Sequence, residues 1–191
     1  MLDYLKQVDR ELFLLINGCH ADGLDPVMVF ISAKLSWIPL YAYLFYLIVK
    51  NYKRNAIYII LAIIVMITLS DQGSVLLFKN IFQRLRPCHE PSLQHLVHLV
   101  NNKCGGAFGF ISSHAANTMA LSVFIFMLLN GKLGKPFLLI FLFPLVVGYS
   151  RVYLGIHYPA DVICGMIFGG LIGYLTTWIY FKIMSAKIIK T

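Results

Sequence analysis

The stretch SRVYLGIHYPAD, residues 150–161, places Arg151, His157 and Asp161 close together in a chain that is otherwise apolar. Pro159 suits an early helical position, so we expect His157 just before a helix and Asp161 in its first turn. A carboxylate at this spacing can accept a hydrogen bond from one imidazole nitrogen, which fixes the tautomer and leaves the other nitrogen free to react. The spacing therefore predicts a reactive histidine beside a fixed cation.

A second stretch, KNIFQRLRP, carries Lys79 and Arg86 seven residues apart. On a helix this spacing returns to nearly the same face after two turns. Pro87 disfavours helix at the residue before it, so we expect the two cations on one face of the last helical turns. Arg84, between them, is well explained as a cation that extends to the lipid headgroups.

The third stretch, GFISSHAANTMAL, reads as the start of an apolar helix. Either Ser112 or Ser113 is suited to be the N-cap, and His114 then lies in or beside the first turn. Unpaired backbone N–H groups and the positive end of the helix dipole make such a start a good site for an anion.

Fixed cations, helix-start amides and two histidines are the groups that phosphoryl transfer requires, because positive charge stabilises the phosphoryl oxygens during in-line attack. Apart from Asp161, Glu90 is the one carboxylate in the loops that carry these motifs, too few for a magnesium pair. Histidines beside arginines also make a poor zinc site. We therefore expect a reaction without a metal or any other cofactor.

The elements that must position these residues are membrane-spanning helices. Hydrophobic residues make up 59% of the 191-residue chain and charged residues 13%, which is too apolar for a soluble domain of this size. Crossing the hydrocarbon core takes roughly 20 helical residues. Five apolar runs come near that length: 27–49, 55–78, 113–130, 135–150 and 160–183.

We expect residues 1–191 to form a single all-α domain, a polytopic transmembrane helix bundle whose motif-bearing core is 56–180. Residues 1–24 favour an amphipathic interfacial helix, although a sixth, partial span through this region is the alternative. The apolar side chains that recur at helical spacing there are Leu2, Leu5, Val8, Leu12 and Leu15.

Positive charge sets the predicted orientation, because cytoplasmic loops are rich in lysine and arginine. The loops after the first, third and fifth predicted spans share one face, which we expect to be cytoplasmic, and the motifs lie on the other. The net charge of +8 is split between the two faces, so nucleic acid is not an expected partner. The basic residues that indicate the cytoplasmic face are Lys50, Lys53, Arg54, Lys132, Lys135, Lys182, Lys187 and Lys190.

Cys88 and Cys104 are placed at the two ends of the long outer loop. An oxidising exterior favours a disulfide between them, and two free thiols are the alternative. Nothing in the sequence indicates the oligomeric state.

Asp71 lies inside a predicted span, where a carboxylate is costly and is by default a functional candidate. We favour a structural role, because about 12 Å of helix separates it from Lys79. In the last span, Gly165, Gly169 and Gly173 have the spacing of a close helix contact.

The ordered triple of K-x6-RP from Lys79, SSH at 112–114 and SR-x5-H-x3-D from Ser150 resembles the signature of the type 2 phosphatidic acid phosphatase superfamily, which also contains vanadium haloperoxidases. One departure is in the second motif, which usually reads Pro-Ser-Gly-His, so that Ser113 stands at the glycine position.

The resemblance implies a role for each matching residue. His157 would be the nucleophile that forms a phosphohistidine, Asp161 would orient it, and His114 would protonate the leaving oxygen. The groups that would hold the phosphate are Lys79, Arg86, Arg151, the Ser112 hydroxyl and the Ser113 backbone N–H.

The resemblance also implies the activity: a metal-independent phosphatase in the bacterial cytoplasmic (inner) membrane, with its site facing the periplasm or cell exterior. The partners would be the bilayer and a phosphorylated lipid, with undecaprenyl diphosphate, phosphatidylglycerol phosphate, phosphatidic acid and lipid A as candidate substrates. Two alternatives are a lipid phosphotransferase and a protein that binds or transports a phosphorylated lipid without turnover. A haem protein with His114 and His157 as axial ligands would leave Arg151 and Asp161 unexplained.

Overall fold

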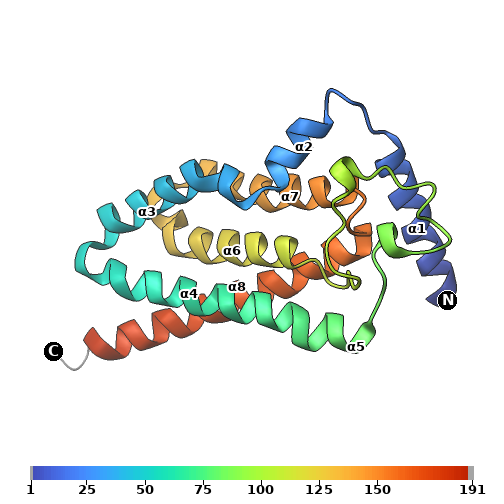
Figure 1. Ribbon diagram of the computed structural model, residues 1–191. Coiled ribbons are helices and arrows are strands. Elements are labelled where there is room, and N and C mark those ends of the chain that lie inside the picture. The colour runs from blue at the N-terminus through green and yellow to red at the C-terminus, as the bar shows by residue number, and fades with distance from the viewer. Residues whose placement is uncertain (1, 189–191) are drawn as a thin grey trace.

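A computed structural model describes residues 2–188, which form a bundle of helices with no strand among them (Figure 1). The predicted fold class, a polytopic helix bundle, is therefore confirmed. The main helices are α1 (Leu2–Gly18), α2 (Asp25–Ser32), α3 (Ile38–Tyr52), α4 (Ala56–Gly73), α6 (Ser113–Leu133), α7 (Leu142–Tyr153) and α8 (Pro159–Ile188).

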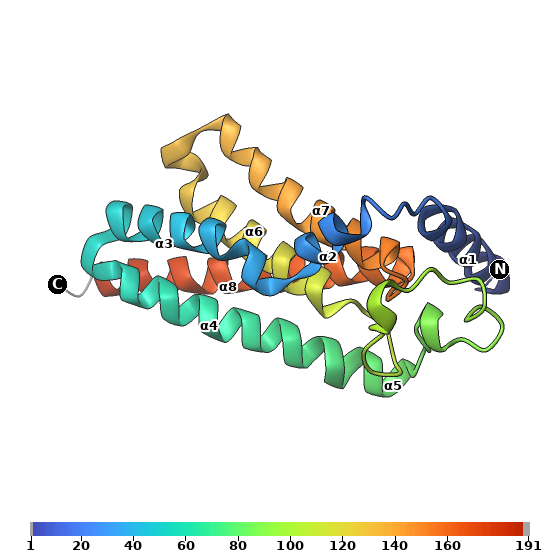
Figure 2. The same ribbon diagram turned by 45° about the horizontal axis from the view of Figure 1, so that its top comes forward.

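Apolar helical segments in the described part of the chain are long enough to cross a membrane at Lys34–Phe82, Ser113–Leu133 and Pro159–Ala186, and Phe137–Tyr153 is a shorter one. The first contains a turn at Lys53–Asn55, so α3 and α4 run side by side in opposite directions (Figures 1 and 2). Large apolar side chains cover the outside of the bundle, such as Ile64 and Leu171 at 57% and 56% exposure. Such a surface suits lipid, and the chain is a membrane protein.

The first predicted span, 27–49, begins too early in the sequence prediction. Residues 25–32 form the separate helix α2, because the backbone at Ala33 is extended and a 3₁₀ turn, Lys34–Trp37, leads into α3. Figure 2 shows α2 set at an angle to α3.

Helix α6 lies at the centre of the bundle and packs most closely against α8. A Cβ atom added at Gly165, Gly169 or Gly173 would lie 2.6, 2.0 or 2.5 Å from a backbone oxygen of α6 or its N-cap. The predicted glycine contact is thus confirmed, since a side chain there would push the helices apart.

Helix α1 packs against the end of the bundle through one stripe of residues four apart. Asp9, Phe13 and Asn17 are buried, whereas Leu12 and Leu15 on other faces are 45% and 64% exposed. Asn17 donates hydrogen bonds to the carbonyl oxygens of His98 and Tyr153 at 2.9 and 2.7 Å. The amphipathic helix predicted within 1–24 is confirmed, and α1 does not count among the described helices able to span a membrane.

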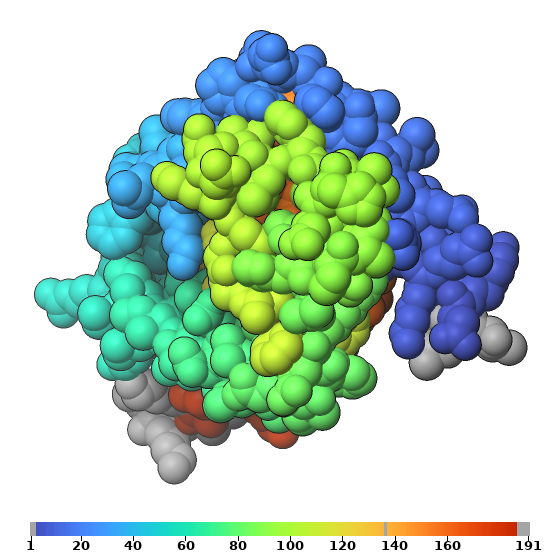
Figure 3. Space-filling view, turned by 45° about the vertical axis from the view of Figure 1, so that its right-hand side comes forward, coloured from blue at the N-terminus to red at the C-terminus, as the bar shows by residue number. Residues whose placement is uncertain are grey.

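A long loop, residues 83–112, covers the same end of the bundle as α1 (Figure 3). A disulfide joins Cys88 to Cys104 with 6.1 Å between their Cα atoms. Leu85 and Phe108 form an isolated antiparallel bridge between the two arms of the loop. These cross-links tie the two arms of the loop together.

Candidate active site

The three motifs meet at one cavity of about 520 Å³ near the end of the bundle that α1 and the loop cover. The side chains come from the helical segment that continues α4, the loop, the start of α6, the end of α7 and the segment before α8. The motif residues that line the cavity are Lys79, Arg86, Ser113, His114, Arg151 and His157. Ser112 and Asp161 lie behind this lining.

His157 and Asp161 form the buried back of the site. Nδ1 of His157 lies 3.4 Å from Oδ2 of Asp161, and the side chains are 2% and 0% exposed. The same Oδ2 accepts a hydrogen bond from the Tyr158 backbone N–H at 3.0 Å. Helix α8 begins at Pro159, as predicted, and this start places the carboxylate beside the ring.

Burial lowers the pKa of His157 well below its usual value of 6.5, and the positive charges of Arg86, Arg151 and Lys79 lower it further. The imidazole is therefore neutral at physiological pH. A neutral ring keeps a lone pair, which a nucleophile or a base needs.

Gly109 leaves room for this pair and was missed at the sequence level. A Cβ atom there would lie 3.1 Å from Oδ2 of Asp161 and 3.5 Å from Nδ1 of His157. It would also lie 3.1 Å from Cγ of Arg86. The closeness of these three side chains favours glycine at this point of the loop.

Lys79 and Arg86 reach the cavity, but not from one helix as predicted. The helical backbone continues through a π-helical segment, Ser74–Lys79, and α5 (Asn80–Phe82), and stops where Gln83 takes a left-handed conformation. Arg86 itself has an extended backbone in the loop. The prediction failed because the helix ends four residues earlier than Pro87 alone requires.

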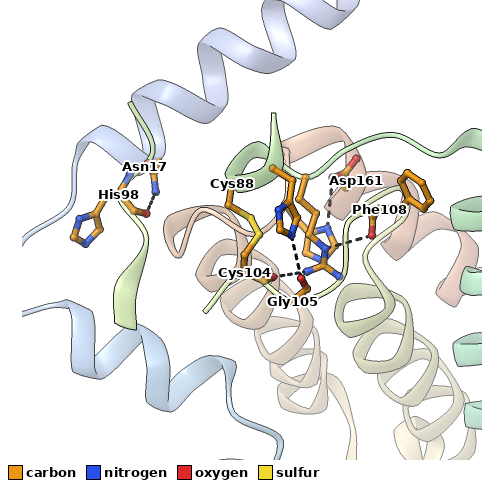
Figure 4. Close-up of a disulfide and its surroundings, with 10 residues drawn as sticks. Asn17, Cys88, His98, Cys104, Gly105, Phe108 and Asp161 are labelled. Atoms are coloured by element: carbon orange, nitrogen blue, oxygen red, sulfur yellow. Dashed lines mark hydrogen bonds and ion pairs between the residues drawn. A yellow bond between two sulfur atoms is a disulfide. The ribbon is translucent and has the colours of Figure 1, made fainter. Parts of the chain in front are cut away.

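Loop carbonyl groups hold Arg86 in place. Its guanidinium donates to the carbonyl oxygen of Phe108 at 3.3 Å and to that of Cys104 at 3.0 Å, beside the disulfide (Figure 4). Burial lowers the pKa of Arg86, while the charge of Asp161 raises it. An arginine nevertheless remains charged in proteins, so the loop supplies a fixed cation.

The other two cations are positioned by serines. Nζ of Lys79 donates to Oγ of Ser113 at 2.7 Å, and Oγ of Ser74 lies 2.5 Å from that same oxygen. Nη1 of Arg151 is hydrogen-bonded to Oγ of Ser32 on α2. Nε of Arg151 is buried with no partner within the described residues, as suits a donor that waits for an anion.

The start of α6 follows the helix-start prediction. Ser112 is the N-cap, and its Oγ accepts from the backbone N–H of Ala115 at 3.5 Å. Because this hydroxyl is fully buried and bonded to the helix, it lies away from the cavity surface. His114 follows in the first turn and lines the cavity.

The deeper part of the cavity contains polar groups that belong to none of the motifs. Nδ2 of Asn117 donates to Oδ1 of Asp71 at 3.1 Å, and Oδ1 of Asn117 is buried with no partner within the described residues. Asp71, for which the sequence favoured a structural role, thus lines the site itself. Its apolar neighbours in the cavity wall are Tyr41, Ile63, Ile67, Leu121 and Phe143, and Lys34 adds a further cation.

Arg84 was wrongly interpreted as a headgroup contact. It forms ion pairs with Asp161 at 3.1 Å and with Asp9 of α1 at 2.7 Å. No pattern in the sequence indicates this contact, because 75 residues separate Arg84 from Asp9.

Comparison with known proteins agrees with this geometry. Residues 56–185 match the family model of the PAP2 superfamily. The chain is 36% identical to a lipid A 4'-phosphatase of Bacteroides thetaiotaomicron, over 97% of this chain and 82% of the relative. It is 30% identical to an undecaprenyl-diphosphatase of Sulfolobus acidocaldarius, over 88% of this chain and 77% of the relative.

Among solved structures, a PAP2-type phosphatidylglycerolphosphate phosphatase from Bacillus subtilis superposes with a TM-score of 0.70 at 23% identity. The match covers 94% of this chain and 88% of that chain. At this identity the likeness concerns the fold alone.

Proposed function

Because the chain belongs to the PAP2 superfamily, we propose that it is a metal-independent membrane phosphatase that removes a phosphate from lipid A, an acylated and phosphorylated disaccharide. The observation that carries this choice of substrate is the 36% identity to a lipid A 4'-phosphatase over nearly the whole chain. The cavity contains the groups that such a reaction requires, and its three motif cations come from three separate segments.

In the proposed reaction His157 is the nucleophile. Its Nδ1 faces Asp161, which leaves Nε2 to attack the phosphorus. The N–P bond forms as the bond to the sugar oxygen breaks, and His114 donates a proton to that oxygen. Water, deprotonated by His114, then attacks the phosphohistidine, and inorganic phosphate leaves as His157 is regenerated.

Lys79, Arg86 and Arg151 stabilise the charge on the phosphoryl oxygens during both steps. Each is held in advance by a serine or by loop carbonyl groups. Preorganised donors of this kind need no rearrangement when charge develops, which is why they lower the barrier. The backbone N–H of Ser113 at the start of α6 can add a further donor.

The leaving group is expected near Asn117, which follows His114 by one turn on α6. The unpaired Oδ1 of Asn117 is an acceptor, and the carboxylate of Asp71 lies next to it. Acceptors favour a leaving group that carries hydroxyl or amide N–H donors. A sugar has such donors, whereas the monophosphate that leaves from an isoprenoid diphosphate has none on its lipid chain.

The placement in the cell is part of the same proposal. The basic residues of the loops opposite the site, such as Lys53 and Arg54, favour a cytoplasmic position for that end. The cavity then faces the periplasm or cell exterior from the bacterial inner membrane. The disulfide in the covering loop supports an oxidising compartment on this side.

Hydrolysis of undecaprenyl diphosphate is the second candidate, because the archaeal relative matches over most of its length. The test is phosphate release by the purified protein in detergent, with EDTA present, from lipid A and from undecaprenyl diphosphate. We expect release from lipid A by the wild type and none by the His157→Ala variant. Release of phosphate from undecaprenyl diphosphate alone would favour the second candidate. Release from neither lipid would favour a phosphotransferase or a protein that binds a phosphorylated lipid without turnover.

A further inference from the structure

Arg84 joins two carboxylates that come from distant parts of the chain. Its Nη1 donates to Oδ1 of Asp161 at 3.1 Å, and its Nη2 donates to Oδ2 of Asp9 at 2.7 Å. Asp161 is fully buried and Asp9 is 7% exposed. Buried charges are stable where they are paired and hydrogen-bonded, as all three are here. Through Arg84, α1 is therefore linked to the carboxylate behind His157.

Asp9 also binds the start of α8. Its Oδ1 accepts a hydrogen bond from the Ala160 backbone N–H at 2.8 Å, one residue before Asp161. A carboxylate at a helix start satisfies an otherwise unpaired donor and interacts favourably with the helix dipole. Both oxygens of Asp9 are therefore engaged, one with Arg84 and one with the turn that carries Asp161.

Tyr158 completes the contact between α1 and this segment. The guanidinium of Arg84 lies over the Tyr158 ring, 3.9 Å from its centroid. Phe13, one turn after Asp9 on α1, meets the same ring edge-on, with 5.4 Å between the centroids. The segment from Tyr158 to Asp161 is thus held from one side by α1.

The charges of this group contribute to the electric field at His157, together with the cations Arg86, Arg151 and Lys79 on the cavity side. Arg84 carries one positive charge, and Asp9 and Asp161 carry one negative charge each, so the three side chains together remain negative. Without the carboxylate of Asp9, Arg84 would pair with Asp161 alone and the remaining pair would be neutral. A neutral pair stabilises positive charge on the imidazole less well when the N–P bond forms.

We infer that Asp9 is a positioning residue of the active site, which holds Arg84 and the start of α8 so that Asp161 presents a charged oxygen to His157. This inference rests on the proposed role of His157. Helix α1 then belongs to the catalytic apparatus, although it lies outside residues 56–185 that match the family model.

The test compares Asp9→Asn with Asp3→Asn in the full-length protein, using phosphate release from lipid A micelles. The amide in Asp9→Asn can still accept from Ala160 but carries no charge. Asp3 is a matched control on the same helix, because it is exposed and its one ion pair among the described residues is with Lys6, at 4.0 Å. Asp9→Glu, which restores the charge, should recover part of the rate.

We expect Asp9→Asn to lower kcat by about 10- to 100-fold with KM little changed, as for other residues that orient a reactive group. The acid limb of kcat/KM should also move to lower pH, because His157 loses nearby negative charge. Asp3→Asn should keep the wild-type rate and profile.

A purely structural role would lower the melting temperature and leave the pH profile of the folded fraction unchanged, and that result would overturn the inference. Wild-type kcat in Asp9→Asn would do the same. Activity in His157→Ala would instead refute the proposed mechanism, so the two failures are distinguishable.

Discussion

Nδ1 of His157 lies 3.4 Å from Oδ2 of Asp161, and both side chains are almost completely buried. The carboxylate is held from the other side by Arg84 and by a backbone N–H. At 3.4 Å Nδ1 does not yet form a hydrogen bond with the carboxylate, and closing this distance would fix one tautomer of the imidazole.

Replacing His157 by alanine should abolish phosphate release, because alanine has no nitrogen that can form the N–P bond. Asp161→Asn should lower kcat by about 10²-fold or more, since the wrong tautomer removes the reactive lone pair. Phosphate release and a melting curve for each purified variant check this. Wild-type turnover in His157→Ala would remove the residue from the nucleophile's role.

In the pH profile of kcat/KM, the fall in rate on the acid side should lie below pH 6.5. Burial and the charges of Arg86, Arg151 and Lys79 depress the pKa of His157, so the ring stays neutral and reactive at pH values where an exposed histidine is already protonated. The free energy of unfolding depends on pH in the same direction as the rate. The stability that this group contributes is complete above pH 6.5 and is lost as the pH falls, because the unfolded chain binds the proton first. A rate profile that declines already above pH 6.5 would contradict this assignment.

Gly169→Ala should destabilise the bundle, because its Cβ would lie 2.0 Å from the carbonyl oxygen of Ala116 and force α8 away from α6. Overpacking of this kind costs about 1–3 kcal/mol or more. Gly170→Ala is the matched control on the next face of α8, where the nearest atom is a Met119 side-chain carbon at 3.7 Å. Thermal unfolding in detergent measures both, and equal melting temperatures would show that the helices can separate at little cost.

Asn117→Leu keeps the approximate volume of the side chain and removes the unpaired acceptor in the deep part of the cavity. We expect kcat/KM for lipid A to fall by about tenfold or more, because a hydroxyl or amide of the leaving sugar loses its partner. Hydrolysis of a phosphate lipid without such donors, such as phosphatidic acid, serves as the internal control and should change little. An equal loss on both lipids would mean that Asn117 does not select the leaving group.

Much of the scaffold was predictable because it follows from local rules. Apolar runs of sufficient length predict the membrane helices, Pro159 marks the start of α8, and a serine caps α6. The glycine spacing on α8 predicts the close contact with α6. In each case the signal lies within one helix, so neighbouring residues carry it.

The rest depends on contacts between segments that are far apart in the chain. Arg86 is placed by loop carbonyl groups near a disulfide rather than by a helix. Arg84 finds Asp9 only after α1 has packed on the bundle. Asp71 enters the site because the cavity continues inward between the helices, which the distance along α4 alone does not reveal.

The apolar walls of the cavity, including Ile63 and Leu121, belong to helices that lie in the membrane. We therefore expect a phosphorylated lipid to reach the cations by lateral diffusion, with its acyl chains still surrounded by other lipids. The concentration that governs turnover is then the mole fraction of substrate within the leaflet. Adding inert lipid to the same bilayer would slow the enzyme, whereas adding water around it would not.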